Sequence, residues 1–244
     1  MIDAEENGRR AAGELKERLD AVRARIERAA CRVGRDPGAV TLVAASKTVP
    51  VERLVEAVAC GCRIFGENRI QEALAKIEAM RSEAGIEWHL IGPLQPNKVK
   101  HAVGRFSLLH AVDRLDVAER LDRAARERGI TQRILLEVNV SGETTKHGFS
   151  PDDLASVAER METLTGLRVL GLMTLPPPAE RPEDARPHFR RLRELAAQVE
   201  ALGIPGVAMK ELSMGMSGDF DVAIEEGATM VRIGTALFGP RPVG

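Results

Sequence analysis

The chain has 244 residues, of which 44% are hydrophobic, and a formal net charge of −1. This length fits one large domain or two small ones, and the hydrophobic share is enough for a sizeable core. Because the charge is close to zero, no long-range field attracts nucleic acid or an anionic membrane, and we expect neither as a partner.

The sequence pattern also bears on the compartment. The first residues, MIDAEENGRR, contain no apolar signal core, and no apolar run approaches membrane-spanning length. Cys31, Cys60 and Cys62 are odd in number and lack the spacing of a zinc site or a disulfide framework. We therefore expect a cytoplasmic protein without a bound metal.

Apolar periodicity predicts a helix followed by alternating strands and helices. From Glu14 to Val33, apolar side chains recur at steps of three and four, which indicates an amphipathic helix on the outside of the fold. The predicted strands are 41–46, 63–66, 88–92, 108–112, 133–140, 167–173, 210–213 and 230–234. The helices that follow them lie near 51–59, 70–80, 98–103, 115–128, from 150 onward, 189–202, 220–226 and around Leu237.

Each predicted strand is a continuous apolar run, which is typical of parallel strands buried on both faces. Eight strand–helix units in one chain favour an α/β fold, a single (β/α)8 TIM barrel over residues 1–244 with an additional N-terminal helix. An open, doubly wound sheet is the alternative. Asp113 is expected to cap the helix after it, and Ser150 with Pro151 to open the next one. In such a barrel, the loops after the strands build the site at one mouth.

Lys47 closes the first apolar run, TLVAASK, at the predicted mouth. A lysine at such a position often only extends to solvent, and this interpretation stays open. A Schiff-base lysine must be neutral to attack a carbonyl, and desolvation by apolar strands lowers its pKa in that direction. Lys210 begins its predicted strand, so we expect it at the opposite face of the barrel.

Two segments rich in glycine and hydroxyl groups accompany the last two strands, LSMGMSGD (212–219) and VRIGTALFG (231–239). Their glycines allow close approach of the backbone, and each segment precedes a predicted helix whose N-terminal N–H groups attract an anion. Phosphate sites of TIM barrels commonly use these two loops. Two ordinary turns are the alternative.

Arg232 lies inside the apolar strand MVRIG, and a buried guanidinium must find a partner. One hypothesis is an ion pair with a strand-end acid such as Glu67 or Asp219. The other is a hydrogen bond to an acceptor on a bound ring. The residues alone leave both open.

Lys47, Arg232 and the two glycine-rich segments lie in six sequence segments by which the chain resembles the pyridoxal-phosphate homeostasis protein family. The barrel of that family is similar to the barrel of bacterial alanine racemase. The segments are AASKT (44–48), FGENRIQE (65–72), WHLIGPLQPNK (88–98), GLMTLPPP (171–178), LSMGMSGD (212–219) and VRIGTALFG (231–239). The chain departs from the family at Arg69, where an aromatic residue is usual, and at Gly218, which is often acidic. Both positions bear on how the pocket mouth closes.

The resemblance implies pyridoxal 5′-phosphate as the cofactor, held as a Schiff base on Lys47. It implies that Arg232 faces the pyridine nitrogen, where a permanent cation keeps that nitrogen unprotonated. Asn68 is implied to lie near the cofactor, and Met173 to line the pocket. The implied phosphate ligands are Ser213, Ser217, Gly234 and Thr235.

The expected function is binding without turnover. Alanine racemase uses two bases, the cofactor lysine and a tyrosine from a second domain, but this chain contains no Tyr. We therefore expect a monomer that serves intracellular pyridoxal-phosphate (vitamin B6) homeostasis, with pyridoxal-phosphate-dependent apo-enzymes as recipients of the cofactor. One alternative is a slow amino-acid racemase or related enzyme, with His147 or water as the second proton carrier. A barrel aldolase that uses Lys47 on a sugar phosphate is another.

Three other side chains are candidates for a second base or a cofactor contact. His89 and His110 lie inside predicted strands, where we expect core groups. Lys146 lies beside His147 in the loop KHGF, and the resemblance implies that it approaches the cofactor or its phosphate.

Overall fold

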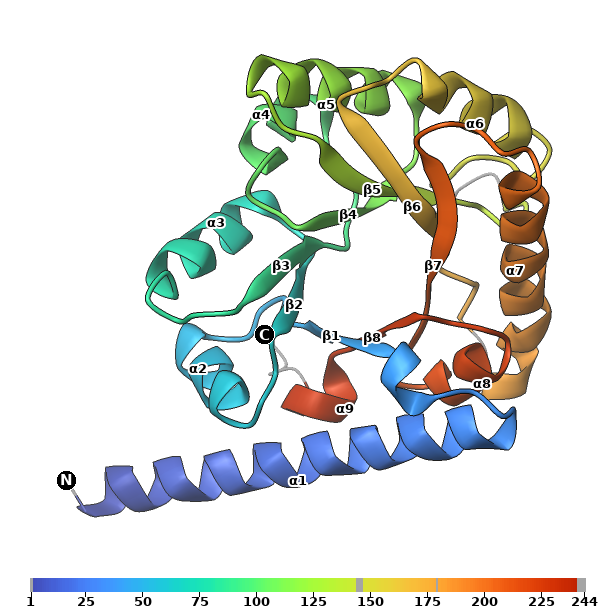
Figure 1. Ribbon diagram of the computed structural model, residues 1–244. Coiled ribbons are helices and arrows are strands. Elements are labelled where there is room, and N and C mark those ends of the chain that lie inside the picture. The colour runs from blue at the N-terminus through green and yellow to red at the C-terminus, as the bar shows by residue number, and fades with distance from the viewer. Residues whose placement is uncertain (1, 144–146, 179, 241–244) are drawn as a thin grey trace.

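The computed structural model is a closed barrel of eight parallel strands surrounded by helices (Figure 1). It describes residues 2–143, 147–178 and 180–240, with side chains from residue 13 onward. The strands follow one another in sequence order around the barrel, and the last pairs with the first through Thr41 and Met230. The predicted TIM barrel is confirmed, and the open sheet is excluded.

The bounds of the elements agree with the predicted alternation. The strands are β1 Thr41–Ala45, β2 Ile64–Glu67, β3 Glu87–Leu90, β4 Leu108–Val112, β5 Gln132–Glu137, β6 Leu167–Met173, β7 Val207–Met216 and β8 Met230–Ile233. The helices are α1 Ile2–Arg32, α2 Val51–Ala59, α3 Ile70–Ala79, α4 Val99–Ala102, α5 Leu115–Glu127, α6 Leu154–Glu162, α7 Arg186–Glu200, α8 Phe220–Glu225 and α9 Thr235–Phe238. Short 3₁₀ segments are η1 Pro37–Ala39, η2 Pro96–Lys98 and η3 Pro182–Ala185.

Both faces of the strands are buried, which explains why their sequences are continuous apolar runs. Inside the barrel, a small cluster includes Val43, Leu135 and Met173, all fully buried. Outward-facing side chains such as Phe65 and Leu136 pack in the larger layer between strands and helices. Alternate residues of each strand therefore serve two different cores.

The long helix α1 lies outside the barrel, against α2, α8 and α9 (Figure 1). Its predicted apolar stripe is buried, since Leu15 and Leu19 are fully enclosed. Arg25 donates to Asp221 of α8 at 2.6 Å and stacks over the Phe220 ring. The helix begins well before the predicted start at Glu14.

Strand β7 differs from the prediction, because it spans Val207–Met216 rather than 210–213. Lys210 therefore lies within the strand and does not begin it. Lys210 is exposed and is the fourth residue of β7, in the half of the strand away from its carboxyl end. The predicted start of the strand at Lys210 was therefore wrong, but Lys210 does lie away from the carboxyl end of β7.

The start of α5 at Leu115 is confirmed, but its predicted cap was wrong, and so was the predicted start of α6. Arg114, not Asp113, occupies the cap position of α5, and the Asp113 carboxylate contacts His147 instead. Helix α6 begins at Leu154, and the Ser150 hydroxyl accepts the N–H of Asp152 in a turn before it. A side chain at a cap-like position is free to satisfy a nearer donor or cation, which the sequence pattern does not reveal.

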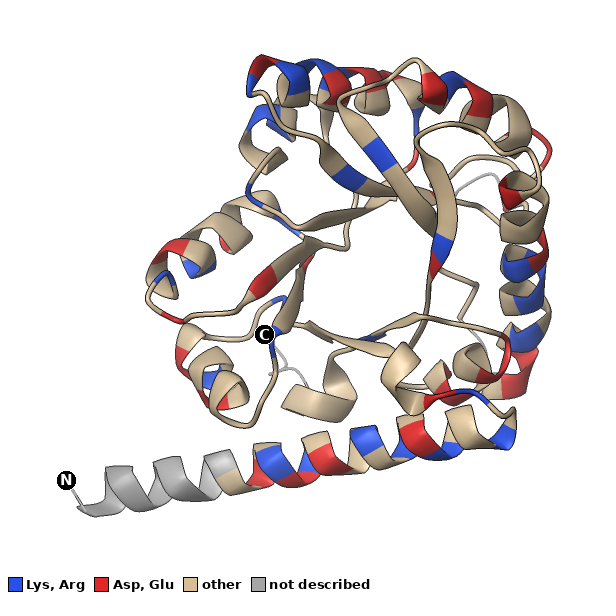
Figure 2. Cartoon of the chain, viewed as in Figure 1, with Lys and Arg blue, Asp and Glu red and all other residues tan. Residues whose placement is uncertain are grey.

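Charges of both signs are mixed over the outer helices, while the strands are mostly uncharged (Figure 2). Along the described residues, no helix has the length and hydropathy needed to cross a lipid bilayer.

The crossing of β6 and β7 supplies a test of the packing. A Cβ atom at Gly171 would overlap the backbone carbonyl oxygen of Glu211, whereas one at Gly13, on an exposed part of α1, would meet nothing. We expect Gly171→Ala to lower the free energy of unfolding by about 3 kcal/mol, and Gly13→Ala to raise it by about 0.5–1 kcal/mol. Urea denaturation of both variants measures the difference, and equal stabilities would contradict the register of β6 and β7.

Candidate functional site

A cavity of about 440 Å³ opens at the carboxyl ends of the strands. It brings together six side chains or backbone positions predicted from sequence, namely Lys47, Asn68, Ser217, Arg232, Gly234 and Thr235. These positions follow β1, β2, β7 and β8 or end them, so the fold gathers residues that are almost 190 positions apart in the chain. The expected mouth of the barrel is therefore the place where the predicted site residues meet.

The sequence did not single out the apolar wall of this cavity. Ile91, Leu175 and Met216 also line it. Ile91 is nearly buried, whereas Leu175 and Met216 are 41% and 40% exposed at the rim. Large apolar side chains that stay exposed beside a polar cavity are a signal of ligand contact, but only the structure shows their exposure.

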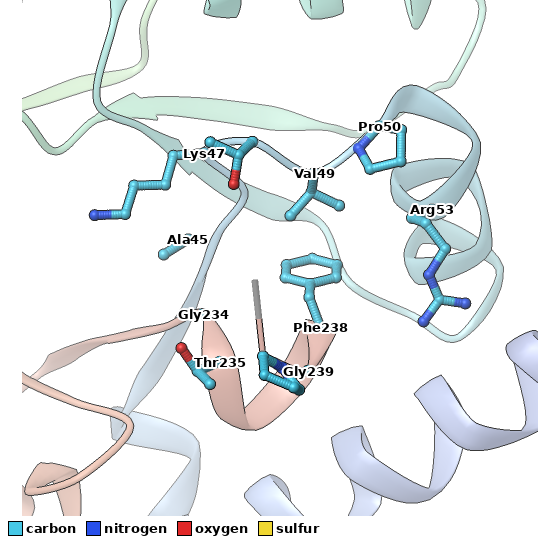
Figure 3. A pocket seen from close by; sticks show the side chains of 11 residues that line it. Ala45, Lys47, Val49, Pro50, Arg53, Gly234, Thr235, Phe238 and Gly239 are labelled. Carbon is cyan, nitrogen blue, oxygen red and sulfur yellow. The ribbon is translucent and has the colours of Figure 1, made fainter. Parts of the chain in front are cut away.

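Lys47 lies in the turn after β1 and is half-buried. It borders the cavity of about 440 Å³ and also a second one of about 250 Å³. Figure 3 shows this second cavity, with the Lys47 side chain running past Ala45 and away from Phe238 and Arg53. The amine thus points away from the Phe238 side of this cavity, and Lys47 also lines the larger one.

A second lysine, Lys76 of α3, is buried directly behind Lys47. Its ammonium donates to the Ser46 carbonyl at 2.7 Å, to Glu67 Oε1 at 2.8 Å and to Glu72 Oε1 at 2.6 Å. Burial raises the pKa of Glu67, although hydrogen bonds from Lys76 and Ser46 act against that rise. Glu67 Oε2 has no hydrogen-bond partner. The ammonium of Lys76 is therefore the main stabiliser of a carboxylate that water does not reach.

This cluster also fixes the backbone around Lys47. Thr48 has a φ of 64°, and among the described residues it alone has a positive φ without being glycine. Such a conformation costs about 1 kcal/mol. The N–H of Thr48 donates to Glu72 Oε1 at 2.6 Å, and Lys76 holds the carbonyl of Ser46. Hydrogen bonds on both sides thus offset the strain and fix the direction in which Lys47 leaves the chain.

The segments expected to hold an anion flank the cavity. The Ser217 hydroxyl accepts the N–H of Ala236 at 3.2 Å and so ties the loop after β7 to α9. Gly234 lies against β1, where an added Cβ would approach the Ala45 carbonyl to 3.3 Å. Asp219 accepts the N–H of Met216 at 2.6 Å, and burial raises the pKa of its carboxyl group.

Arg232 is 4% exposed, and its hydrogen-bond partners are neutral. It donates to the Ser213 hydroxyl at 2.5 Å and to the Thr174 carbonyl at 2.9 Å. Neither acid proposed from sequence is bonded to it, because Glu67 bonds to Lys76 and Asp219 to backbone. Burial lowers the pKa of Arg232 to about 10, with Glu137 and Asp219 opposing that change, so it stays a cation at neutral pH.

Two of the predicted cofactor residues do not line the cavity. Ser213 is fully buried inside the barrel, between Arg232 and His110, so the structure does not support its expected role as a phosphate ligand. Met173 is fully buried in the apolar cluster inside the barrel, so its expected place in the pocket wall is also not supported. Side chains of consecutive strand residues point to opposite faces, and a shift of the strand end decides which residues reach the mouth.

A group of acids lies near the same mouth. The Asp113 carboxylate contacts His147 Nδ1 at 3.1 Å, and His147 itself is largely exposed. Burial, together with the neighbouring Asp113, raises the pKa of Glu137 to about 7. None of these three residues lines the cavity beside Lys47. Lys146, expected to approach the cofactor, lies outside the described residues.

Sequence relatives identify the chain. A family model described as the alanine racemase N-terminal domain matches residues 18–242. The pyridoxal phosphate homeostasis protein of Aquifex aeolicus is 50% identical over 225 residues, 92% of this chain and 97% of that protein. The protein of the same name from Pseudomonas aeruginosa is 45% identical over 231 residues, 94% of this chain and 97% of that one. The chain belongs to the pyridoxal phosphate homeostasis protein family.

Solved structures of similar proteins agree with this membership. PipY of Synechococcus elongatus PCC7942 without PLP is 38% identical, with a TM-score of 0.83 over 92% of this chain and 100% of that one. The structure of PipY with PLP bound has a TM-score of 0.81 at 37% identity, with the same coverage. Alanine racemase of Corynebacterium glutamicum, at 18% identity and a TM-score of 0.65, shares the fold over 93% of this chain and 63% of that one.

The two departures from the family pattern fall in different places. Gly218 lines the cavity beside Ser217. Arg69 is exposed at the cap position of α3 and does not line it. Of the two, only the change at Gly218 alters the wall of the site in this family member.

The buried lysine gives a prediction about stability. We expect Lys76→Met to lower the free energy of unfolding by about 3–5 kcal/mol, since it leaves buried Glu67 without its cation. The double variant Lys76→Met/Glu67→Gln should recover much of this loss. Lys16→Met is the matched control, because Lys16 also pairs with an acid four residues away at 2.8 Å but is exposed, and it should change little. Urea denaturation that gives equal losses for the two lysines would contradict this role of Lys76.

Proposed function

We propose that this protein binds pyridoxal 5′-phosphate as a Schiff base on Lys47 and serves in pyridoxal-phosphate homeostasis without turning over amino acids. The observation that carries the proposal is the convergence of an amine, a buried guanidinium and hydroxyl-bearing loops on one cavity. Its volume of about 440 Å³ is in the range of small-molecule sites. The family relatives bear names that match this function.

The residues of the cavity fit the groups of the cofactor. Lys47 supplies the amine, and Arg232 faces the cavity from the end of β8. Ser217, Gly234 and Thr235 would hold the phosphate, with Asn68 near the ring. When bound, pyridoxal phosphate supplies an aldehyde that condenses with an amine and a ring that withdraws electrons.

Arg232 determines how the site treats the ring nitrogen. A guanidinium only donates hydrogen bonds, so it leaves a facing ring nitrogen unprotonated. The ring then withdraws electrons less strongly.

Among the described residues that line the cavity, no second base is evident besides Lys47. The sequence contains no Tyr, and His147, the residue weighed for a slow racemase, contacts Asp113 and does not line the cavity. The Lys47 amine is thus the one proton acceptor that the described lining of the cavity offers. We assign no racemase activity on this basis.

We further propose a cytoplasmic monomer that passes the cofactor to pyridoxal-phosphate-dependent apo-enzymes. Cys31, Cys60 and Cys62 are all free thiols, which suits a reducing compartment. Recipient enzymes are proposed because a carrier without turnover needs an acceptor.

The pure protein loaded with pyridoxal phosphate should show a visible absorption band that borohydride abolishes. Lys47→Ala should lose this band and keep the circular dichroism of the fold, because the turn after β1 is exposed at one side. Lys210→Ala is the control and should keep the band, because Lys210 is exposed and lies in the half of β7 away from the carboxyl ends of the strands. A band that survives in Lys47→Ala, or efficient turnover of an amino acid by the natural chain, would contradict the proposal.

A further inference from the structure

The barrel interior contains a continuous hydrogen-bonded row of polar side chains below Arg232. Arg232 donates to Ser213 Oγ at 2.5 Å, and Ser213 Oγ lies 2.8 Å from His110 Nδ1. His110 Nε2 lies 3.0 Å from His89 Nδ1. The row crosses from β8 through β7 and β4 to β3, and every member is at least 96% buried. No part of the row lies on the surface.

The cation at the top of the row fixes where the protons lie. Because a guanidinium only donates, Ser213 Oγ accepts from Arg232 and has its own proton to place. His110 Nδ1 is the only acceptor for that proton among the described residues. His110 then carries its proton on Nε2 and donates to His89 Nδ1, which leaves the proton of His89 on Nε2, 3.9 Å from the Glu87 carboxylate.

Burial is the main reason that both histidines are neutral, and neighbouring basic groups act in the same direction. Burial lowers the pKa of His89 to about 4, and Arg133 of β5 acts in the same direction. Burial also lowers the pKa of His110, as do His89 and Arg232. Glu87, at the start of β3, is the acid nearest to His89, and it is half exposed to solvent. Neutral rings can accept at one nitrogen and donate at the other, which a charged ring cannot.

We propose that His110 and Ser213 are positioning residues, which hold the Arg232 guanidinium toward the cavity through a one-directional hydrogen-bond chain that ends at His89. The inference rests on the proposed function, in which Arg232 faces the ring nitrogen of the cofactor. The Thr174 carbonyl holds the other terminal nitrogen of Arg232, so two fixed acceptors define its plane. Because these acceptors are neutral, no anion among the described residues is hydrogen-bonded to Arg232 and offsets the charge that it presents to a ligand.

The direction of the hydrogen bonds along the row can be tested without the cofactor. In the full chain labelled with ¹⁵N-histidine, His89 and His110 should be neutral rings protonated on Nε2, and neither should titrate between about pH 5 and 8. His110→Phe assigns the signals, and His101, exposed on α4, is the internal control. A proton on Nδ1 of His110, or a charged histidine ring in this pH range, would contradict the proposed direction of the hydrogen bonds.

The positioning role is tested by a cycle of variants and the dissociation constant of pyridoxal phosphate. Ser213→Ala should weaken binding about tenfold, the scale of one hydrogen bond to a charged group. In an Arg232→Ala background the same change should have no further effect, because the residue that Ser213 positions is gone. Thr229→Val, which removes a hydroxyl between β7 and β8 that bonds to Glu211 and Leu212, is the matched control and should leave binding unchanged.

The outcomes separate the two proposals. If the natural chain forms no borohydride-reducible adduct, the proposed function fails. If the adduct forms and Ser213→Ala binds pyridoxal phosphate as tightly as the natural chain, the positioning role fails by itself. Equal weakening by Ser213→Ala with and without Arg232 would indicate a merely structural effect and would also overturn it.

Discussion

A buried cation must be satisfied by hydrogen bonds, and this constraint applies to Lys76 of α3 and to Arg232 of β8. Lys76 is satisfied by Ser46, Glu67 and Glu72, and the same bonds hold the turn that carries Lys47. Arg232 is satisfied by neutral acceptors, Ser213 and Thr174. Lys76 is thus paired with acids and supports the structure, whereas the hydrogen bonds of Arg232 to described residues go to neutral groups.

The barrel and most of the cavity could be predicted from the sequence. Continuous apolar runs indicate strands buried on both faces, and the rule that sites lie after the strands then selected Lys47 and the glycine-rich segments. Asn68 was expected only from the resemblance to the family. Ser213 was misplaced because β7 runs on to Met216, so Ser213 lies inside the barrel and Ser217 reaches the mouth. An apolar run shows that a strand exists, but it does not show the residue at which that strand ends.

Lys76 and the histidines show a second limit of sequence reasoning. Lys76 lies on a helix with mixed charges, a pattern typical of a solvated face, and only the position of Glu67 beneath it explains its burial. His89 and His110 were expected as core groups, and they are buried. Their connection to Arg232 depends on which strands are neighbours across the barrel interior, and no local spacing encodes that.

The central claim is that one amine, Lys47, carries the cofactor. Peptide mass spectrometry of the protein reduced with borohydride in the presence of pyridoxal phosphate tests it most directly. The account predicts the pyridoxyl mass on the peptide that contains Lys47 and on no other. A label on Lys76 or Lys210, or no label at all, would contradict it.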